Sequence, residues 1–364
     1  MSETVTLKIS GEVFDGWTSI DLRAAMMDMC WGFRLSLVDK APGQTDRSLI
    51  TDGASCEVWV SGDLFLTGYI DDVDEQIDDS NHDIVVSGRT KTGDLVDCSA
   101  VSKSWKNQTL AVIAADICKP FGIELKIETA IGAPFASFAV EPGETASAAL
   151  MRAARLRGVM LGTNAAGELR IFTPSTGAAK LTYVLGRDMK RVRRTTSSAD
   201  RFSEYTVKGQ HSGAYGMSAN DAALSKGTAV DAGVKRHRPI TLVADDQVTL
   251  AGLKARAAFE ATVRLGRSQG VTFDVVGWRD PDGKLLTPDQ LARIVAARID
   301  INRDFMLAEI GFRLAESTTS SLRFVRPEAY TTEVIPVPKA KKSRKTGKSK
   351  QDDSDWTTTP GAGA

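Results

Sequence analysis

Alternation of apolar and polar residues dominates the first part of the chain. Every second residue is apolar in the segments 5–9, 31–37 and 56–60, which is the period of a half-buried β-strand. A Ser-Gly-Asp turn joins the third segment to an apolar run at 64–70, and this arrangement predicts a hairpin. Short strands with turns between them and little helical periodicity are typical of a small barrel or sandwich. We therefore predict a first β-barrel over residues 1–95.

Helical periodicity appears in the next section of the chain, residues 96–178. Leu, Ile and Ala residues at helical spacing predict a helix at 109–118, and a strand is expected at 123–127. A second helix is predicted at 144–157, where a glycine follows as the expected C-cap. The two apolar segments between 159 and 172 predict a hairpin. These elements together describe a compact α/β insert.

Strand patterns return in the last part of the body, residues 179–335. Strands are expected at 181–185, 202–207, 271–276, 294–301, 306–314 and 322–325. One prominent helix is expected at about 250–265, and residues 211–235, rich in Gly, Ala and Ser, predict a long loop. The fold class is therefore α+β, mainly β, with two small β-barrel domains and an α/β insert between them. The pattern leaves open whether strands after the insert complete the first barrel.

Charge is balanced overall but not along the chain. The 364 residues carry 46 Lys and Arg against 46 Asp and Glu. Seven of the basic residues lie between 339 and 350 and three acids follow, so the body 1–338 holds 39 basic and 43 acidic residues. The tail has few large apolar side chains, and we predict that 336–364 is disordered. A solubilising terminus is more common for such a charge run than nucleic-acid contact, so no specific nucleic-acid recognition is expected.

Cysteine usage and hydropathy favour a cytosolic setting. The four cysteines are Cys30, Cys56, Cys98 and Cys118, and none forms a Cys-x-x-Cys pair. This spacing fits reduced thiols better than a disulfide framework or a zinc site. The first residues lack the pattern of a signal peptide, and no window approaches the roughly 20 apolar residues of a membrane-spanning helix.

Motifs for nucleotide binding and hydrolysis fail on their spacing. The run 346–349 ends like a phosphate-binding loop, but Lys342 stands where that loop needs glycine. The three histidines have no spaced ligand partner, and the metalloprotease and esterase motifs are missing from the sequence. Isolated tryptophans such as Trp105 and Trp278 are more often core residues than sugar platforms. We therefore expect no catalytic residue, no cofactor and no metal, although a distant carboxylate pair for glycoside cleavage stays open.

Acidic residues are concentrated in the run 71–83. It lacks the central glycine and the closing glutamate of a calcium-binding loop. Val73 and Ile77 alternate with acids in this run. That alternation favours a solvated edge strand over a cation site.

Several local signatures, in order along the chain, resemble a known family. They are Gly88–Ser99, Trp105 with Thr109-Leu110, the 144–158 helix with Gly167-Glu168-Leu169, Arg256–Glu260 with Arg264–Ser268, and Gly277-Trp278 with Asp282-Gly283-Lys284. Together they resemble the baseplate hub proteins of Mu-like contractile-tailed phages, over roughly residues 4–330. That family is related to the late-control D proteins and to the N-terminal part of type VI secretion spike proteins.

The resemblance implies a structural role in the virion. Members of the family form homotrimers in which each chain contributes two related β-barrels, so that three chains make a near-sixfold ring. Such a ring joins the sixfold tail tube to the threefold central spike, among other baseplate proteins. The resemblance further implies that the protein assembles in the host cytoplasm, that DNA passes through the channel only as cargo, and that the protein has no enzymatic activity. This chain has no β-helical needle and no length for a lysozyme-like domain, so a separate spike protein is expected.

Candidate interface residues lie on the predicted basic helix. Arg256, Glu260, Arg264 and Arg267 are our candidates for contacts between subunits. A cyclic trimer needs head-to-tail interfaces that close, and the acidic stretch 71–83 is a complementary surface for this helix.

Two other functional classes compete with the hub. A tail-tip enzyme that degrades cell wall requires a clustered pair of titratable groups in a cleft. A secreted carbohydrate-binding β protein is disfavoured, because a signal peptide is missing and the four cysteines are unpaired.

Overall fold

The computed structural model describes residues 3–39, 50–79, 82–209, 226–243, 250–314 and 317–330. The predicted disordered tail at 336–364 lies outside these residues. Most of the predicted loop at 211–235 lies outside them as well, up to residue 225.

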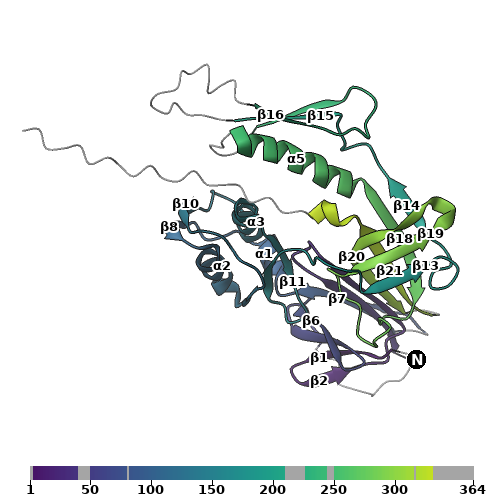
Figure 1. Cartoon of the computed structure of the whole chain (residues 1–364). Helices are drawn as coiled ribbons and strands as arrows, with labels where there is room; N and C mark the ends of the chain where they lie inside the picture. Colours follow the sequence, from purple (N-terminus) through teal and green to yellow (C-terminus); the bar gives the residue numbers. More distant parts are fainter. Residues whose placement is uncertain are drawn as a thin grey trace, which may run out of the picture.

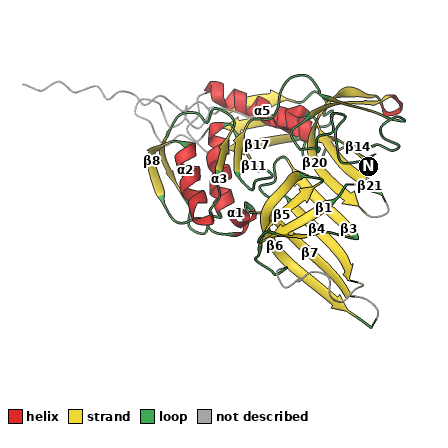
Figure 2. Cartoon of the chain, turned by 90° about the horizontal axis from the view of Figure 1, so that it is seen from below, coloured by secondary structure: helices red, strands yellow, loops and turns green. Residues whose placement is uncertain are grey.

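A thirteen-stranded sheet forms the centre of the molecule (Figures 1 and 2). Its first part contains β1 (Val5–Ile9), β2 (Glu12–Phe14), β3 (Ser19–Ala25), β4 (Gly32–Asp39), β5 (Ser55–Val60), β6 (Asp63–Ile77) and β7 (His82–Thr90). The order of these strands in the sheet is β3-β4-β7-β6-β5-β1-β2. The predicted hairpin is the β5–β6 pair, in which Val60 lies opposite Asp63. Alternation correctly predicts β1, β4 and β5, because each of them buries one face, whereas β2 and β3 are not predicted.

The insert lies beside this sheet and has its own core. It contains α1 (Gly93–Asp97), β8 (Ser104–Gln108), α2 (Leu110–Cys118), η2 (Lys119–Phe121), β9 (Leu125–Ile127), β10 (Phe135–Ala139), α3 (Ala146–Arg157), β11 (Met160–Thr163) and β12 (Leu169–Phe172). Both helices that the sequence predicts are confirmed, and Thr109 and Thr145 cap their first turns through side-chain oxygens. Gly158 ends α3 with a φ of 62°, a left-handed conformation that favours glycine. Figure 2 shows α2 and α3 at one side of the main sheet.

The last part of the chain adds six strands to the main sheet and a small separate layer. The elements are β13 (Leu181–Val184), β14 (Arg193–Thr196), β15 (Glu204–Lys208), β16 (Lys226–Val230), β17 (Pro239–Val243), α5 (Leu250–Arg267), β18 (Gln269–Val276), β19 (Leu291–Ala296), η3 (Ala297–Ile299), β20 (Ile301–Leu314), β21 (Thr318–Val325) and η4 (Pro327–Tyr330). The order continues from β3 as β20-β21-β18-β14, and β19 pairs with both β20 and β13. The mainly β, α+β fold class is confirmed. The limits predicted for the domains, 1–95, 96–178 and 179–335, remain predictions.

The two parts of the main sheet meet at the β3–β20 pair. Ala24 lies opposite Ile310 in this antiparallel ladder, so residues from the two ends of the chain are neighbours. Behind the ladder, Phe65 packs on Trp31 at 5.8 Å and on Phe312 at 5.9 Å between ring centroids. Trp278 completes this aromatic row by packing 5.3 Å from Phe312. One hydrophobic core therefore extends through both parts.

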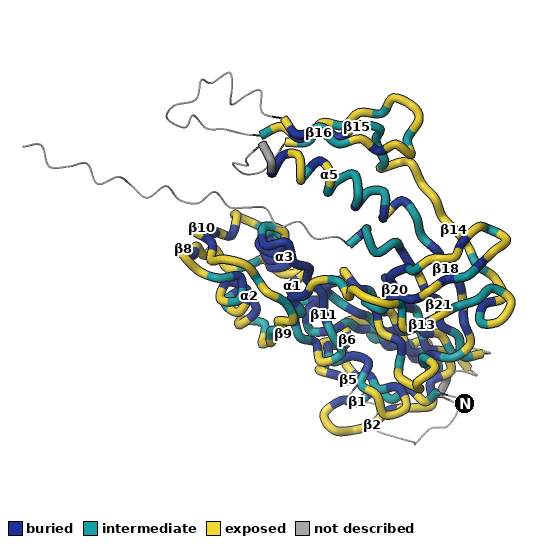
Figure 3. Tube along the Cα trace, in the orientation of Figure 1, coloured by how far each residue is buried: buried dark blue, intermediate teal, exposed yellow. Residues whose placement is uncertain are grey.

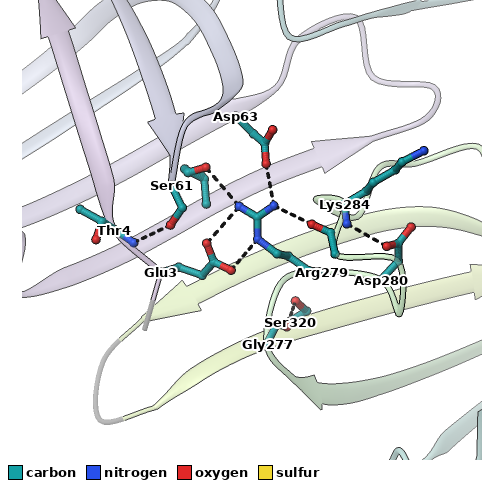
Figure 4. Close-up of polar contacts among 11 residues, drawn as sticks. Glu3, Thr4, Ser61, Asp63, Gly277, Arg279, Asp280, Lys284 and Ser320 are labelled. Carbon is teal, nitrogen blue, oxygen red and sulfur yellow. Dashed lines mark hydrogen bonds and ion pairs between the residues drawn. The ribbon is translucent and has the colours of Figure 1, made fainter. Parts of the chain in front are cut away.

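A charged cluster fastens the N-terminal strand region to the turn after β18 (Figure 4). Arg279 donates hydrogen bonds to both carboxylate oxygens of Glu3, at 2.8 and 3.3 Å, and to Asp63 at 2.6 Å. Its guanidinium also donates to the carbonyl oxygens of Val60 and Gly283. Because the Glu3 side chain is only 10% exposed, this contact is shielded from much of the solvent.

The sequence pattern predicts only one strand of the small layer β16-β15-β17, since the strand expected at 202–207 corresponds to β15. Residues 226–230 fall in the predicted loop, but they form β16, so the prediction is wrong there. Its burial pattern alternates, but the inward positions are held by Gly227 and Ala229, and Gly227 is the only residue of the strand that is buried. A β-carbon at Gly227 would lie 2.2 Å from the Leu253 carbonyl carbon of α5. The strand therefore uses glycine for a close backbone approach, and glycine carries no hydrophobic signal.

Candidate partner-binding surface on helix α5

Helix α5 connects the small layer to the rest of the molecule. Leu253 and Ala257 are buried against β15 and β16, which Figure 1 shows running along the helix. At the C-terminal end of the helix, a β-carbon on Gly266 would lie 2.2 Å from the backbone nitrogen of Ala329 in η4. The helix is therefore held at both ends, and its remaining surface carries the four candidate residues.

An ion-pair network joins three of these candidates. Glu260 accepts hydrogen bonds from Arg256 at 2.7 Å and from Arg264 at 3.1 Å, both at i,i+4 spacing. About a quarter of each arginine side chain is exposed. Such pairs stabilise a helix by about 0.3–0.5 kcal/mol each. The network fixes the arginines in place and compensates part of their charge within the same helix.

A groove of about 530 Å³ lies between α5, α3 and η4. Arg256, Glu260 and Arg267 line it from α5. The apolar walls come from Met27, Ala148, Met151, Ala154, Val159, Met160, Leu161, Phe259, Val263, Ala329 and Tyr330. Met27 and Met151 are 43% and 49% exposed, which is high for such large apolar side chains. Arg155 adds a charged residue from α3, so the groove has the character of a partner-binding surface, with an apolar floor and charged residues from both helices.

Tyr330 lines the groove as an uncharged side chain, with Arg267 nearby. Burial raises the pKa of Tyr330 to about 12, and the nearby carboxylates of Glu309 and Asp28 act in the same direction. The hydroxyl is therefore protonated at neutral pH, so the arginines and Glu260 supply the charge in this region.

A smaller recess of about 170 Å³ lies along the same helix. Arg264, Arg267 and Glu260 line it together with Ser197, Asp200, Val263 and Ser268. All four candidate residues therefore line one or both of these hollows. Their predicted role in subunit contacts remains a prediction.

The acidic stretch 71–83, which we proposed as a complementary surface for this helix, begins on strand β6. Residues 71–77 form the second part of β6, and six of the seven are exposed. Asp71 is held by Arg89, which also binds Asp97. Within the described ranges no ion pair joins this stretch to α5.

The two buried cysteine thiols are not activated nucleophiles. Burial raises the pKa of both the Cys56 and the Cys118 thiols to about 12, and the charges of Asp71 and Glu57 add to the effect at Cys56. Both thiols are therefore protonated and inert at neutral pH. No group of three or more potential metal ligands occurs among the residues that the structure covers. Trp105 and Trp278 are buried, as the sequence predicts for core residues.

Three family profiles match successive parts of the chain. The match at residues 4–90 is to the N-terminal region of Mu phage baseplate assembly protein GpP-like proteins, and that at 92–173 to the second domain of baseplate hub protein gp44-like proteins. Residues 249–333 match the fourth domain of Mu phage baseplate assembly protein GpP. The chain is also 36% identical to the baseplate hub protein gp44 of Escherichia phage Mu over 361 residues, covering 96% of this chain and 94% of the relative. The chain belongs to the Mu gp44-like baseplate hub proteins.

Solved structures agree with this assignment. The 43 kDa tail protein of prophage MuSo2 from Shewanella oneidensis is 32% identical and superposes with a TM-score of 0.81, covering 92% of this chain and all of the other. A tail protein from Neisseria meningitidis, 23% identical, has the same fold with a TM-score of 0.79 and the same coverages. A type VI secretion component from E. coli, c3393, shares the fold more distantly, with a TM-score of 0.51 at 11% identity over 91% of this chain and 80% of the other.

Membership of this family decides between the functional classes. The hub protein is a structural component of a Mu-like phage tail, located in the baseplate of the virion. The relatives are structural tail proteins, so the alternative of a cell-wall-degrading enzyme is wrong. In the part of the chain that is described, no helix is long and apolar enough to cross a membrane.

Proposed function

We propose that three copies of this hub protein form a closed ring with near-sixfold outer symmetry, and that the ring joins the tail tube to a separate central spike protein. Each chain supplies two β regions of similar size, with seven strands from residues 5–90 and six from residues 181–325. Three chains then present six such regions, which is the number of subunits around a sixfold tube. This pair of β regions within one chain is the observation that supports the proposal.

The shared core makes the two β regions suitable for this task. Since the β3–β20 ladder and the aromatic row join them, the regions have a fixed relative orientation within one chain. Because the pair of regions is rigid, the rotation from one β region to the next around the ring axis is the same in every copy. A cyclic ring built from such copies closes through head-to-tail interfaces.

The surface of α5 is a candidate for the contacts that this assembly requires. Arg256, Glu260, Arg264 and Arg267 border the two hollows along the helix. In the proposed ring these residues contact either the neighbouring subunit or another baseplate protein. DNA passes through the channel as cargo, without recognition of its sequence.

Light scattering coupled to size exclusion tests the proposal on the full chain. The monomer mass is 39.1 kDa, so a trimer has three times that value, about 117 kDa. We expect the trimeric mass, either for the protein alone or after mixing with its spike protein. A mass of 39.1 kDa under both conditions contradicts the proposal.

A further inference from the structure

The main sheet has two exposed strand edges that carry opposite charge. The first is β14, which stands at one end of the strand order and pairs with β18. All four of its residues are exposed, as the tube in Figure 3 shows. A strand in this position offers a row of backbone N–H and C=O groups to another strand. In soluble proteins such an edge is either protected or used for pairing.

Basic side chains without acidic partners surround β14. The sequence from Lys190 to Arg194 contains Lys190, Arg191, Arg193 and Arg194. Arg194 donates to the carbonyl oxygen of Ile299 at 2.6 Å. Across the described ranges, the ion pairs found include none with Lys190, Arg191 or Arg193, whereas the neighbouring Arg187 pairs with Asp188 at 2.8 Å. This edge therefore presents uncompensated positive charge.

The second edge is the acidic part of β6. Strand β5 pairs with β6 only as far as Tyr69, which lies opposite Ser55. From Asp72 to Ile77 the strand pairs with β7 alone, so its other side is free of a strand partner within the described residues. Asp72, Asp74 and Glu75 are exposed here. Glu75 lies 3.7 Å from His82, so Asp72 and Asp74 supply most of the negative charge of this edge, which is six residues long against four in β14.

The two edges are far apart in the strand order of one chain. Six strands, β18, β21, β20, β3, β4 and β7, separate β14 from β6. The edges differ from each other, so a contact between them joins unlike surfaces of two copies. That is the heterologous type of interface that a ring requires.

We propose that β14 of one subunit pairs with the 71–77 edge of β6 in the next subunit, with Arg191 and Arg193 facing the acids of that strand. The inference rests on the proposed ring and names the surfaces that close it. Backbone hydrogen bonds between edge strands provide affinity in such pairings. Each pair of opposite charges across neighbouring strands adds about 0.2–1 kcal/mol. Repulsion between like charges also disfavours pairing of β14 with another copy of β14.

Charge reversal and charge exchange on the full chain test this pairing. We expect Arg191→Glu with Arg193→Glu to raise the concentration for half-assembly on the order of tenfold or more, measured by light scattering over a dilution series. The acidic-edge variant Asp72→Arg with Asp74→Arg should have a similar effect. Mixing the two variants, or combining all four changes in one chain, should restore assembly.

A matched control changes the same charge elsewhere. Lys235 and Arg236 are exposed and lie in the loop before β17. Their reversal to Glu should leave assembly unchanged. If the wild-type chain and the β14 variant assemble equally well, the proposed pairing is wrong, but the ring proposal still stands. A wild type that stays monomeric with and without its spike protein overturns both.

Amide hydrogen exchange measures the pairing without mutation. In the assembled protein we expect the amides of 193–196 to exchange at least tenfold more slowly than in the diluted monomer. Equal exchange in the two states overturns the strand pairing. In that case the charges only protect the two edges from aggregation.

Discussion

At the scale of single residues, Arg279 is the side chain that connects the most distant parts of the chain. It binds Glu3 and Asp63 from the first part of the sheet while its own backbone follows β18. Three of its hydrogen bonds go to carboxylates and two to backbone carbonyl oxygens, and such charge-assisted hydrogen bonds are stronger than neutral ones. Its removal leaves the Glu3 carboxylate, 10% exposed, without its cation.

Replacing this guanidinium should therefore weaken the protein measurably. We expect Arg279→Met to lower the free energy of unfolding by about 1–3 kcal/mol at pH 7, as for other hydrogen bonds to charged groups. Urea unfolding followed by circular dichroism gives the value. Arg23→Met is the control, because the Arg23 side chain is 72% exposed and its pair with Asp21 should contribute little. Equal losses for the two variants would contradict the prediction.

The pH dependence of the same contact has a definite sign. Burial acts to raise the pKa of Glu3, but hydrogen bonds from Arg279 and Ser61 and the charge of Arg279 outweigh it, so the pKa lies below the usual 4.5. The stabilisation is present above pH 4.5 and is lost as the pH falls through the lowered pKa. The difference between wild type and Arg279→Met should shrink over that acidic range.

At the scale of elements, α5 holds the small layer through a close backbone contact. Because a β-carbon at Gly227 would meet the Leu253 backbone at 2.2 Å, no side-chain rotation can relieve the overlap. The helix also carries the candidate arginines. The position of the small layer and the position of these arginines are therefore linked.

A methyl group at this contact should separate strand and helix. We expect Gly227→Ala to lower the free energy of unfolding by about 1–3 kcal/mol, as overpacking does, and to increase amide exchange in β15 and β16 before the main sheet is affected. Gly311→Ala in β20 is a matched control, since its nearest neighbour atom would be 3.9 Å away. If Gly227→Ala leaves the free energy of unfolding and the slow amide exchange of β15 and β16 unchanged, the close contact does not hold the layer in place.

Local patterns predict the elements well, and long-range contacts poorly. Alternation identifies the strands at 5–9 and 56–60, and spacing with a capping threonine identifies α2 and α3. The β3–β20 pairing escapes prediction because Ala24 and Ile310 are far apart in sequence and neither carries a signal for the other. The candidate arginines were found from their charge alone. The pattern offers no sign of the groove, because its walls come from α3, η4 and Met27.

At the scale of the whole molecule, the core belongs to both parts of the sheet at once. Phe65 and Phe312 are buried against each other although the insert separates them in the sequence. Among the described residues, the main core of the insert contains none from the last part of the chain, although Met160 and Phe172 of the insert pack in a smaller cluster with Met306. The main sheet should therefore behave as one cooperative unit, with the insert as a second one.

A cavity in the shared core should expose this cooperativity. We expect Phe312→Ala to lower the free energy of unfolding of the main sheet by about 3–5 kcal/mol. Strands β3, β4, β18 and β21 should lose amide protection together, while α2 and α3 keep theirs longer. Exchange measured by mass spectrometry on peptic fragments separates these regions. Loss of protection confined to β18–β21 would contradict a shared core.

The ladder between Ala24 and Ile310 also has a consequence for biosynthesis. A ribosome makes β3 early and its neighbour β20 near the end, so the edge of β3 waits for its partner through most of translation. Until β20 has been made, the early strands keep an unpaired apolar border. Chaperones that shield nascent chains should therefore matter more for the yield of this protein than its balanced charge suggests.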